Sequence, residues 1–309
     1  MLELLRNARD AHATRIYLAI SHEGANRKLC CIDNGDGIPT SMHELVFEPR
    51  VTSKLDTSHR DKWGYHGRGM ALYSIKVNSE IAKISWSAPG LGAAVSVDVD
   101  TTKVSERTDQ STFPTFTLGE AGCVNVRGPK NILRTACEFA LEEHSSCEVF
   151  VGSPTEILAA LYAHGSLELT PIEKAFASRD QQLPLEKSVA SSPDAESLTV
   201  RAAELGLGVS ERSARRVIDG YILEAESMLS RITIDSPATR GRETAKEANS
   251  AVRNLRLTNQ ERDALASSVY QEFSELAEMY YLDSDVDSRI RTRRDHLTID
   301  IPIVPKRDE

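Results

Sequence analysis

The sequence lacks any long apolar run, and no hydrophobic stretch approaches the roughly 20 residues that a helix needs to cross a bilayer. Its first residues, MLELLRNARDAHA, place Arg6 and Arg9 where a signal peptide carries an unbroken apolar stretch. Both absences favour a cytoplasmic protein and argue against a membrane as its partner.

Cysteines are also few, and their spacing matches no known framework. There are five, an odd number with no CxxC pair, so neither a disulfide scaffold nor a zinc site is indicated. Cys30 and Cys31 lie in a strand-like run and are interpreted as small buried hydrophobic residues. The formal net charge of −9 argues against a protein that coats nucleic acid, although a local basic face stays compatible with it.

What the sequence does contain is the composition of an ordinary globular protein. Its 309 residues are 40% hydrophobic and 27% charged, which suits two or three domains. Hydrophobic periodicity indicates a layer of helices on a sheet within residues 1–102. The elements predicted there are helices at 2–13 and within 64–77, and strands at 14–21, 27–33, 81–87 and 92–99.

The pattern changes after this first domain. Residues 103–177 mix strand and helix signals, with helices expected after Pro129 and Pro154, and are predicted to form a small α/β extension or second domain. Residues 178–197, SRDQQLPLEKSVASSPDAES, are rich in serine, proline and charge and are predicted to be a linker. Residues 198–309 are predicted to form a mainly helical domain.

A polar helix face near the N-terminus is the first candidate site. Glu3, Asn7, Asp10 and Ala11 share one side of the predicted first helix. A carboxylate one turn before an amide offers a base for a water molecule and an oxygen ligand for Mg²⁺, which needs few protein ligands beside phosphates and water. Taken alone, the same pattern also fits a solvated helix face.

A glycine turn after the second strand is the next candidate. Asp33 stands at the strand end, where its carboxylate can accept a hydrogen bond from an exocyclic amine. Gly35 and Gly37, before Ile38 and Pro39, let the backbone approach a flat base without a Cβ clash. An ordinary NGDG turn between two strands would look the same.

The third candidate is the glycine-rich loop that opens the segment 64–76, GYHGRGMALYSIK. Gly67, Gly69 and the following Met70 lead into a helix, whose N-terminus supplies backbone N–H groups for phosphates. The spacing differs from the GxGxxG dinucleotide fingerprint. Such a loop by itself is a weak signal.

Together, in this order and spacing, the three segments resemble the GHKL ATPase superfamily: MutL mismatch-repair proteins, type II topoisomerase ATPase subunits, the large heat-shock chaperone and histidine kinases. ELLRNARDAHATRIYLAI, TSKL at 52–55 and GYHGRGMALYSI at 64–75 look like MutL. FEPRVTSK at 47–54 and GRGMALYSIK at 67–76 equally resemble histidine kinases. The resemblance covers residues 1–76 and fades beyond about residue 100.

This resemblance implies an α+β fold of the Bergerat type, with helices on a mixed or antiparallel sheet, ATP between the helices and a lid over roughly residues 45–68. Asp33 would recognise adenine and Asn7 would hold Mg²⁺. Lys54 and Arg68 would meet phosphates, whose developing charge needs cations, or would be solvated lid residues. The full set implied to contact the cofactor is Asn7, Asp10, Asp33, Gly35, Gly37, Ile38, Lys54, Gly67, Arg68, Gly69 and Met70.

Glu3 separates the branches of the superfamily. Hydrolytic members carry a glutamate at this position, four residues before the metal-binding asparagine, whereas histidine kinases usually carry an asparagine. A carboxylate there can deprotonate water, so Glu3 is predicted to be the catalytic base and ATP hydrolysis is favoured. Two alternatives stay open: a histidine-kinase-like transferase that phosphorylates a partner, and an ATP-sensing DNA-binding regulator without catalysis.

A second motif lies in 200–218, VRAAELGLGVSERSARRVI. An alanine-rich helix, a glycine-containing turn and a second helix capped by Ser210 resemble a helix-turn-helix, with a turn slightly longer than usual. Arg212, Arg215 and Arg216 would then face DNA. The alternative is an ordinary helical hairpin with exposed arginines.

Two further expectations concern assembly and the N-terminus. ATP is expected to close the lid and to drive formation of a homodimer that acts on DNA or on a protein partner. Met1 lies inside the helix that positions Glu3, and a helix end at a free terminus frays. We therefore expect that the natural chain starts upstream or that this is a fragment.

Overall fold

A computed structural model of the chain describes residues 1–49, 59–61, 64–66, 70–106, 109–118, 124–170, 173, 183–232, 234–235, 265, 267–271, 273–274, 277, 289–292, 297–301 and 304. The chain divides into two compact units, Met1–Asp235 and Ser236–Glu309. Each unit is described by itself below.

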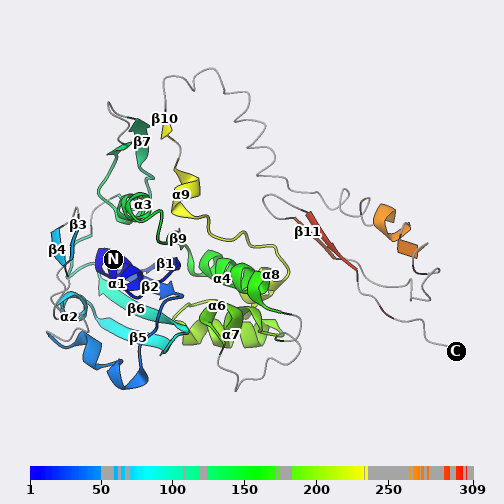
Figure 1. The fold of residues 1–309 in the computed structure, drawn as a ribbon, viewed down its shortest axis with the longest axis horizontal. Coiled ribbons are helices and arrows are strands. Elements are labelled where there is room, and N and C mark those ends of the chain that lie inside the picture. Colours follow the sequence, from blue (N-terminus) through cyan, green and yellow to red (C-terminus); the bar gives the residue numbers. More distant parts are fainter. Residues whose placement is uncertain are drawn as a thin grey trace. The chain divides into compact units, whose positions relative to one another are not determined.

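A five-stranded mixed sheet forms the centre of the first unit (Figure 1). Strand β1 pairs antiparallel with β2 on one side, with Ile16 opposite Asp33, and parallel with β9 on the other. This confirms the predicted α+β fold and its mixed sheet. In spatial order the strands are β5 (Ile81–Ala88), β6 (Gly92–Asp100), β2 (Asn26–Asp33), β1 (Arg15–Glu23) and β9 (Glu148–Gly152).

One face of the sheet is covered by four helices, three from the first 142 residues together with α9. Alternate strand residues such as Ile16, Leu18 and Val149 are buried on this face, as the two-residue period of a strand requires. Helix α1 contributes Leu4 and Leu5 to the same cluster. The covering helices are α1 (Leu2–Asp10), α2 (Ala71–Val77), α3 (Ile132–Glu142) and α9 (Met228–Arg231).

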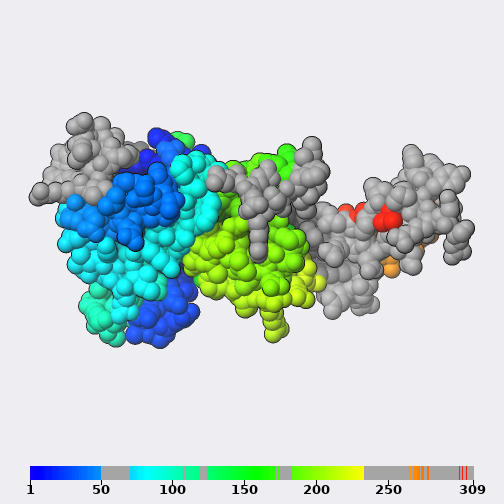
Figure 2. Space-filling view, turned by 90° about the horizontal axis from the view of Figure 1, so that it is seen from below, coloured from blue at the N-terminus to red at the C-terminus, as the bar shows by residue number. Residues whose placement is uncertain are grey.

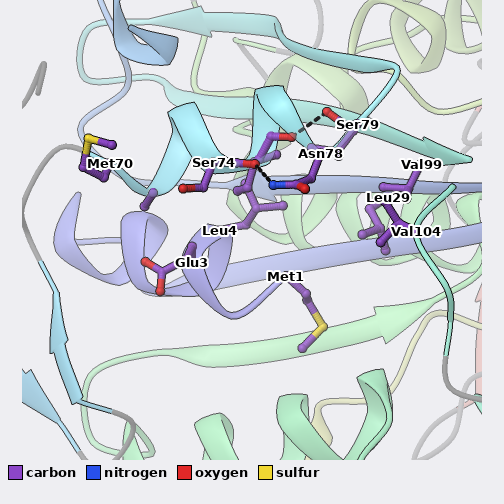
Figure 3. Close-up of a pocket in the computed structure, with 13 residues that line it drawn as sticks. Met1, Glu3, Leu4, Leu29, Met70, Ser74, Asn78, Ser79, Val99 and Val104 are labelled. Carbon is purple, nitrogen blue, oxygen red and sulfur yellow. Dashed lines mark hydrogen bonds between the residues drawn. The ribbon is translucent and has the colours of Figure 1, made fainter. Parts of the chain in front are cut away.

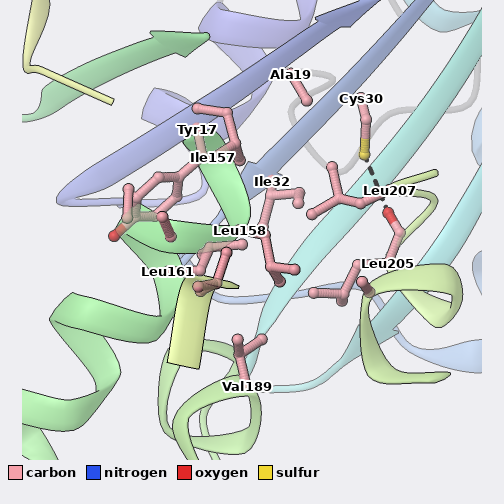
Figure 4. Close-up of a cluster of buried hydrophobic side chains, with 14 of the residues drawn as sticks. Tyr17, Ala19, Cys30, Ile32, Ile157, Leu158, Leu161, Val189, Leu205 and Leu207 are labelled. Atoms are coloured by element: carbon pink, nitrogen blue, oxygen red, sulfur yellow. Dashed lines mark hydrogen bonds between the residues drawn. The ribbon is translucent and has the colours of Figure 1, made fainter. Parts of the chain in front are cut away.

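The opposite face is covered by a second layer of helices. The intervening strand residues, including Tyr17 and Ile32, point to this side and pack against Ile157, Leu158 and Leu205 (Figure 4). The first unit therefore has three layers, because both faces of its sheet are apolar and both must be covered. The helices of this layer are α4 (Pro154–Glu168), α6 (Leu185–Ala190), α7 (Ala195–Glu204) and α8 (Glu211–Ile218).

The segment predicted as a linker belongs in part to this layer. Within 178–197, the described residues 183–197 include α6 and the start of α7. Leu185 and Val189 are fully buried, and they hold α6 against α4 and the sheet. Serine, proline and charge suggested a linker, but apolar residues at helical spacing decide the packing. Accordingly, the first compact unit runs through to Asp235.

A buried polar cluster joins β1 to α4 and α6. Glu186 accepts hydrogen bonds from the Tyr17 hydroxyl at 2.5 Å and from the Arg15 guanidinium at 2.8 Å. The Tyr17 hydroxyl also lies 2.6 Å from Nδ1 of His164. Burial lowers the pKa of His164 to about 4, so its ring is neutral at physiological pH. Arg15 further forms an ion pair with Glu168.

Close contact between α4 and α6 depends on Gly165. A Cβ atom at this position would lie 2.0 Å from the carbonyl oxygen of Glu186 and 2.8 Å from the Cβ of Ala190. We expect Gly165→Ala to lower the free energy of unfolding by about 1–3 kcal/mol, because overpacking outweighs the better helix propensity of alanine. Urea unfolding followed by circular dichroism would measure this. Gly208→Ala is the control, since its added Cβ would meet nothing within 4 Å; equal losses for both would contradict the steric argument.

The described residues also form several smaller elements. Two 3₁₀ turns, Thr40–Met42 and Leu45–Phe47, follow the loop after β2. In the second unit, β11 and β12 pair as an antiparallel ribbon. No helix in the described part of the chain has both the length and the apolar character that a membrane crossing requires. The remaining strands are β3 (His59–Asp61), β4 (Gly64–His66), β7 (Thr115–Leu118), β8 (Val124–Arg127), β10 (Ile234–Asp235), β11 (Arg289–Thr292) and β12 (Leu297–Asp300).

Candidate functional site

The loop after β2 is held to its neighbours on two sides. The side-chain oxygen of Asn34 accepts hydrogen bonds from the backbone N–H groups of Thr14 and Arg15, both at 2.9 Å. The Ile38 N–H donates to the Ser87 hydroxyl at 2.7 Å, which ties the other end of the loop to β5. Neither Asn34 nor Ser87 was identified from sequence. The asparagine is visible in the DNGDG motif, whereas Ser87 has no local signal.

Backbone packing explains the glycines of this loop. A Cβ at Gly35 would lie 2.4 Å from the carbonyl oxygen of Ala11 at the end of α1. Gly37 has φ +69°, and its Cβ would lie 2.0 Å from the carbonyl oxygen of Ala88. The sequence interpretation assigned both glycines to close approach of a ligand. In the structure, the protein's own backbone already requires them.

Asp33 ends β2 with a buried carboxyl group. Asp33 is 6% exposed. Among the described residues, the Gly35 N–H donates a hydrogen bond to its carboxylate at 2.9 Å. Burial raises the pKa of Asp33 from 3.8 to about 7, although the Gly35 hydrogen bond opposes this. The Gly35 N–H engages one carboxyl oxygen, and the other is available to accept a hydrogen bond from a ligand amine.

Asn7, on α1, also has a side-chain atom that is available to a ligand. Its Nδ2 atom is buried and has no hydrogen-bond partner within the described part of the chain. Buried amide groups in proteins are almost always paired, so this NH₂ group suits an acceptor oxygen of a ligand, such as a phosphate oxygen. By contrast, Asp10 is engaged within the protein, because its carboxylate lies 2.9 Å from the Arg9 guanidinium.

Glu3 faces a cavity of about 660 Å³ between α1 and α2 (Figure 3). The Glu3 carboxylate is 35% exposed and forms a 2.6 Å ion pair with Arg6. Met70 and Ser74, at the start of α2, line the same cavity. Two predicted site residues, Glu3 and Met70, are thus brought to one cavity, whereas Asn7 and Asp33 are not among its lining residues.

Four residues predicted to contact the cofactor lie outside the described residues: Lys54, Gly67, Arg68 and Gly69. Among the described residues there is no cluster of three or more histidine, cysteine, aspartate or glutamate side chains that could hold a metal ion. An ion at this site would therefore depend on Asn7 together with ligands that the cofactor brings, which is the coordination that Mg²⁺ favours.

Comparison with known families matches residues 1–124 to the family described as "Histidine kinase-, DNA gyrase B-, and HSP90-like ATPase". Residues 1–124 match the GHKL ATPase family. The match contains α1, the Asp33 loop, α2 and the strands β1, β2, β5 and β6, so it covers every described residue of the candidate site.

Sequence relatives of the GHKL segment are DNA mismatch repair proteins MutL. The protein of Geobacillus thermodenitrificans is 36% identical over 94 residues, which cover 29% of this chain and 14% of the relative. That of Staphylococcus carnosus is 41% identical over 87 residues, covering 27% of this chain and 12% of the relative. Because the matched GHKL segment spans only a small fraction of these relatives, their length beyond it has no counterpart in the match.

Proposed function

We propose that the first unit binds Mg-ATP at the Asp33 loop and α1 and hydrolyses it. The observation that carries the proposal is the buried carboxyl group of Asp33, which accepts a hydrogen bond from Gly35 and has an oxygen left over. A carboxyl group at a strand end with one oxygen available suits the exocyclic amine of adenine, because that oxygen can accept the amine's hydrogen bond.

The metal end of the site rests on Asn7. Asn7 follows Glu3 by one helical turn on α1. Its side-chain oxygen is the proposed metal ligand, and its buried, unpartnered Nδ2 atom would donate to a phosphate oxygen of the cofactor. A bound Mg²⁺ would neutralise phosphate charge there. The protein's own part is to present the Asn7 oxygen and to keep the helix end in place through the contact between Gly35 and Ala11.

Hydrolysis is favoured over phosphotransfer because of Glu3. A carboxylate beside a cavity can orient a water molecule and accept its proton, which a kinase does not need. In this proposal ATP closes the lid and promotes formation of a homodimer, which acts on DNA or on a protein partner, as the MutL likeness suggests. The alternative is transfer of the phosphoryl group to a partner protein.

Asn7→Ala tests the proposed site. We expect the wild type to bind ATP in the presence of Mg²⁺ and to lose most of this binding when Mg²⁺ is removed, whereas Asn7→Ala binds weakly in both conditions. The variant should still fold, because truncation leaves no described protein group without its partner. Titration calorimetry with and without a chelator would measure both affinities.

Asn125→Ala is the matched control. This asparagine is exposed on β8 and does not line the cavity that Glu3 faces, so its loss should leave the Mg²⁺ dependence unchanged. Unaltered Mg-ATP binding by Asn7→Ala would show that the metal ligand lies elsewhere.

A further inference from the structure

The hairpin formed by α7 and α8 is attached rigidly to the sheet. Gly206, in the turn between them, has φ +84°, and a Cβ there would lie 2.1 Å from the Ser96 hydroxyl of β6. Leu205 and Leu207 are each 1% exposed and belong to the core on this face. The turn has six residues, 205–210, whereas a usual helix-turn-helix has a turn of roughly three or four. The additional residues include Leu205, Gly206 and Leu207, which pack against the core.

Helix α8 has two sharply different faces. Ala214 and Val217 are buried against the core, and the helix begins at Ser210, whose hydroxyl accepts a hydrogen bond from the Ser213 N–H. At about 100° per residue, the exposed positions fall within an arc of about 140° on the side opposite the core. These exposed residues are Glu211, Arg212, Arg215 and Arg216.

The exposed face of α8 is positively charged in a protein whose net charge is −9. Arg215 forms a 2.9 Å ion pair with Glu211, and both side chains are mostly exposed. Within the described part of the chain, Arg212 and Arg216 have no carboxylate partner. They are four residues apart and therefore adjacent on the helix surface. Asp219, just beyond the helix end, is the remaining acidic residue of this segment.

We propose that α8 is a docking helix for double-stranded DNA, with Arg212 and Arg216 contacting the phosphate backbone. The major groove admits one α-helix, and in helix-turn-helix proteins the second helix of the hairpin enters it. Guanidinium groups bind phosphate oxygens in a bidentate manner. The hairpin lies at the surface of the first unit, where its yellow-green residues are seen in Figure 2. The inference rests on α8 alone, independently of the proposed ATP site.

The test measures binding of the full chain to a fluorescein-labelled duplex of about 25 base pairs, without nucleotide, from about 50 to about 200 mM salt. We expect Arg212→Gln/Arg216→Gln to bind at least about tenfold more weakly at low salt. The slope of log K against log salt concentration should fall by about 2, because two phosphate contacts are lost. Glutamine retains the helix propensity of the site.

Two further variants make the test specific. Lys76→Gln/Lys103→Gln removes the same charge from two exposed lysines that are paired with carboxylates, and should bind like the wild type. Glu211→Gln frees Arg215 and should bind DNA several-fold more tightly, an effect that loss of structure cannot produce. The proposal is overturned if the wild type does not bind duplex DNA at low salt, if the arginine variant binds equally well, or if Glu211→Gln weakens binding.

Discussion

Glu3→Gln is expected to bind ATP within about threefold of the wild type and to release phosphate about 10²- to 10⁴-fold more slowly. The carboxylate lines the cavity between α1 and α2, so its loss removes a proton acceptor without removing a surface on which ATP rests. Glutamine can still accept the hydrogen bond from Arg6, which is 4% exposed, so the helix should be unchanged. Single-turnover phosphate release would measure the chemical step apart from binding.

The matched control for this variant is Glu143→Gln. Glu143 follows α3 and forms a 2.6 Å ion pair with Arg9 of α1, the helix that carries Glu3. Glu143 does not line the cavity. It should hydrolyse ATP at the wild-type rate. A Glu3→Gln enzyme as active as the wild type would place the base elsewhere. Transfer of the phosphoryl group to a protein, without release, would favour the kinase alternative.

Asp33→Asn is expected to weaken ATP binding about 10²-fold while stabilising the protein in the absence of nucleotide. Asparagine has one acceptor oxygen, and the Gly35 N–H requires it, so the amide NH₂ group would face the adenine amine. Two opposed donors in a buried site cost about 3 kcal/mol. The preference for ATP over GTP should fall as well, because guanine carries an oxygen where adenine carries its amine. Competition titrations would measure both ratios.

The stability effect follows from the raised pKa of Asp33. The folded protein holds a proton on this carboxyl group up to about pH 7, whereas the unfolded chain releases it near 3.8. The free energy of unfolding contributed by Asp33 therefore falls as the pH rises from about 4 to about 7. At pH 8, Asp33→Asn should be more stable than the wild type by about 2–4 kcal/mol, and the two should converge at pH 4.

Measurement of urea unfolding at pH 4 and pH 8 would check this. ATP affinity of the wild type should likewise decrease as the pH falls below 7, because protonation removes the negative acceptor. If Asp33→Asn is no more stable than the wild type at pH 8 but still binds ATP more weakly, the carboxylate of Asp33 already has hydrogen-bond partners in the free protein.

The N-terminal part of the fold could be predicted from sequence because its signals are local. Strands β1 and β2 are rich in apolar residues, and glycine turns mark the end of β2, so their bounds agree with prediction to within two residues. Helix α1 ends at Asp10, earlier than predicted, since His12 adopts φ +58° where the chain turns into β1. The family resemblance rested on these same segments.

Features that depend on distant partners could not be predicted. Serine and proline content assigned 178–197 to a linker, because nothing local reveals that Leu185 and Val189 meet α4 and the sheet. Gly35 looked like a ligand contact, and its neighbour at the end of α1 is visible only in three dimensions. The ion pair of Glu3 with Arg6 could have been predicted, since residues three apart on a helix are neighbours on its surface.

The parallel pairing of β1 with β9 also has a consequence for biosynthesis. Residues 15–19 are synthesised long before residues 148–152, with which they pair. The helices that cover Tyr17 and Ile32 are synthesised later still. A nascent chain that has emerged only as far as residue 124 leaves a strand edge and an apolar sheet face in water, which is a condition that invites aggregation. The segment that carries the candidate site therefore cannot complete its fold before the sequence that follows it has been synthesised, and folding of the first unit requires most of residues 1–235.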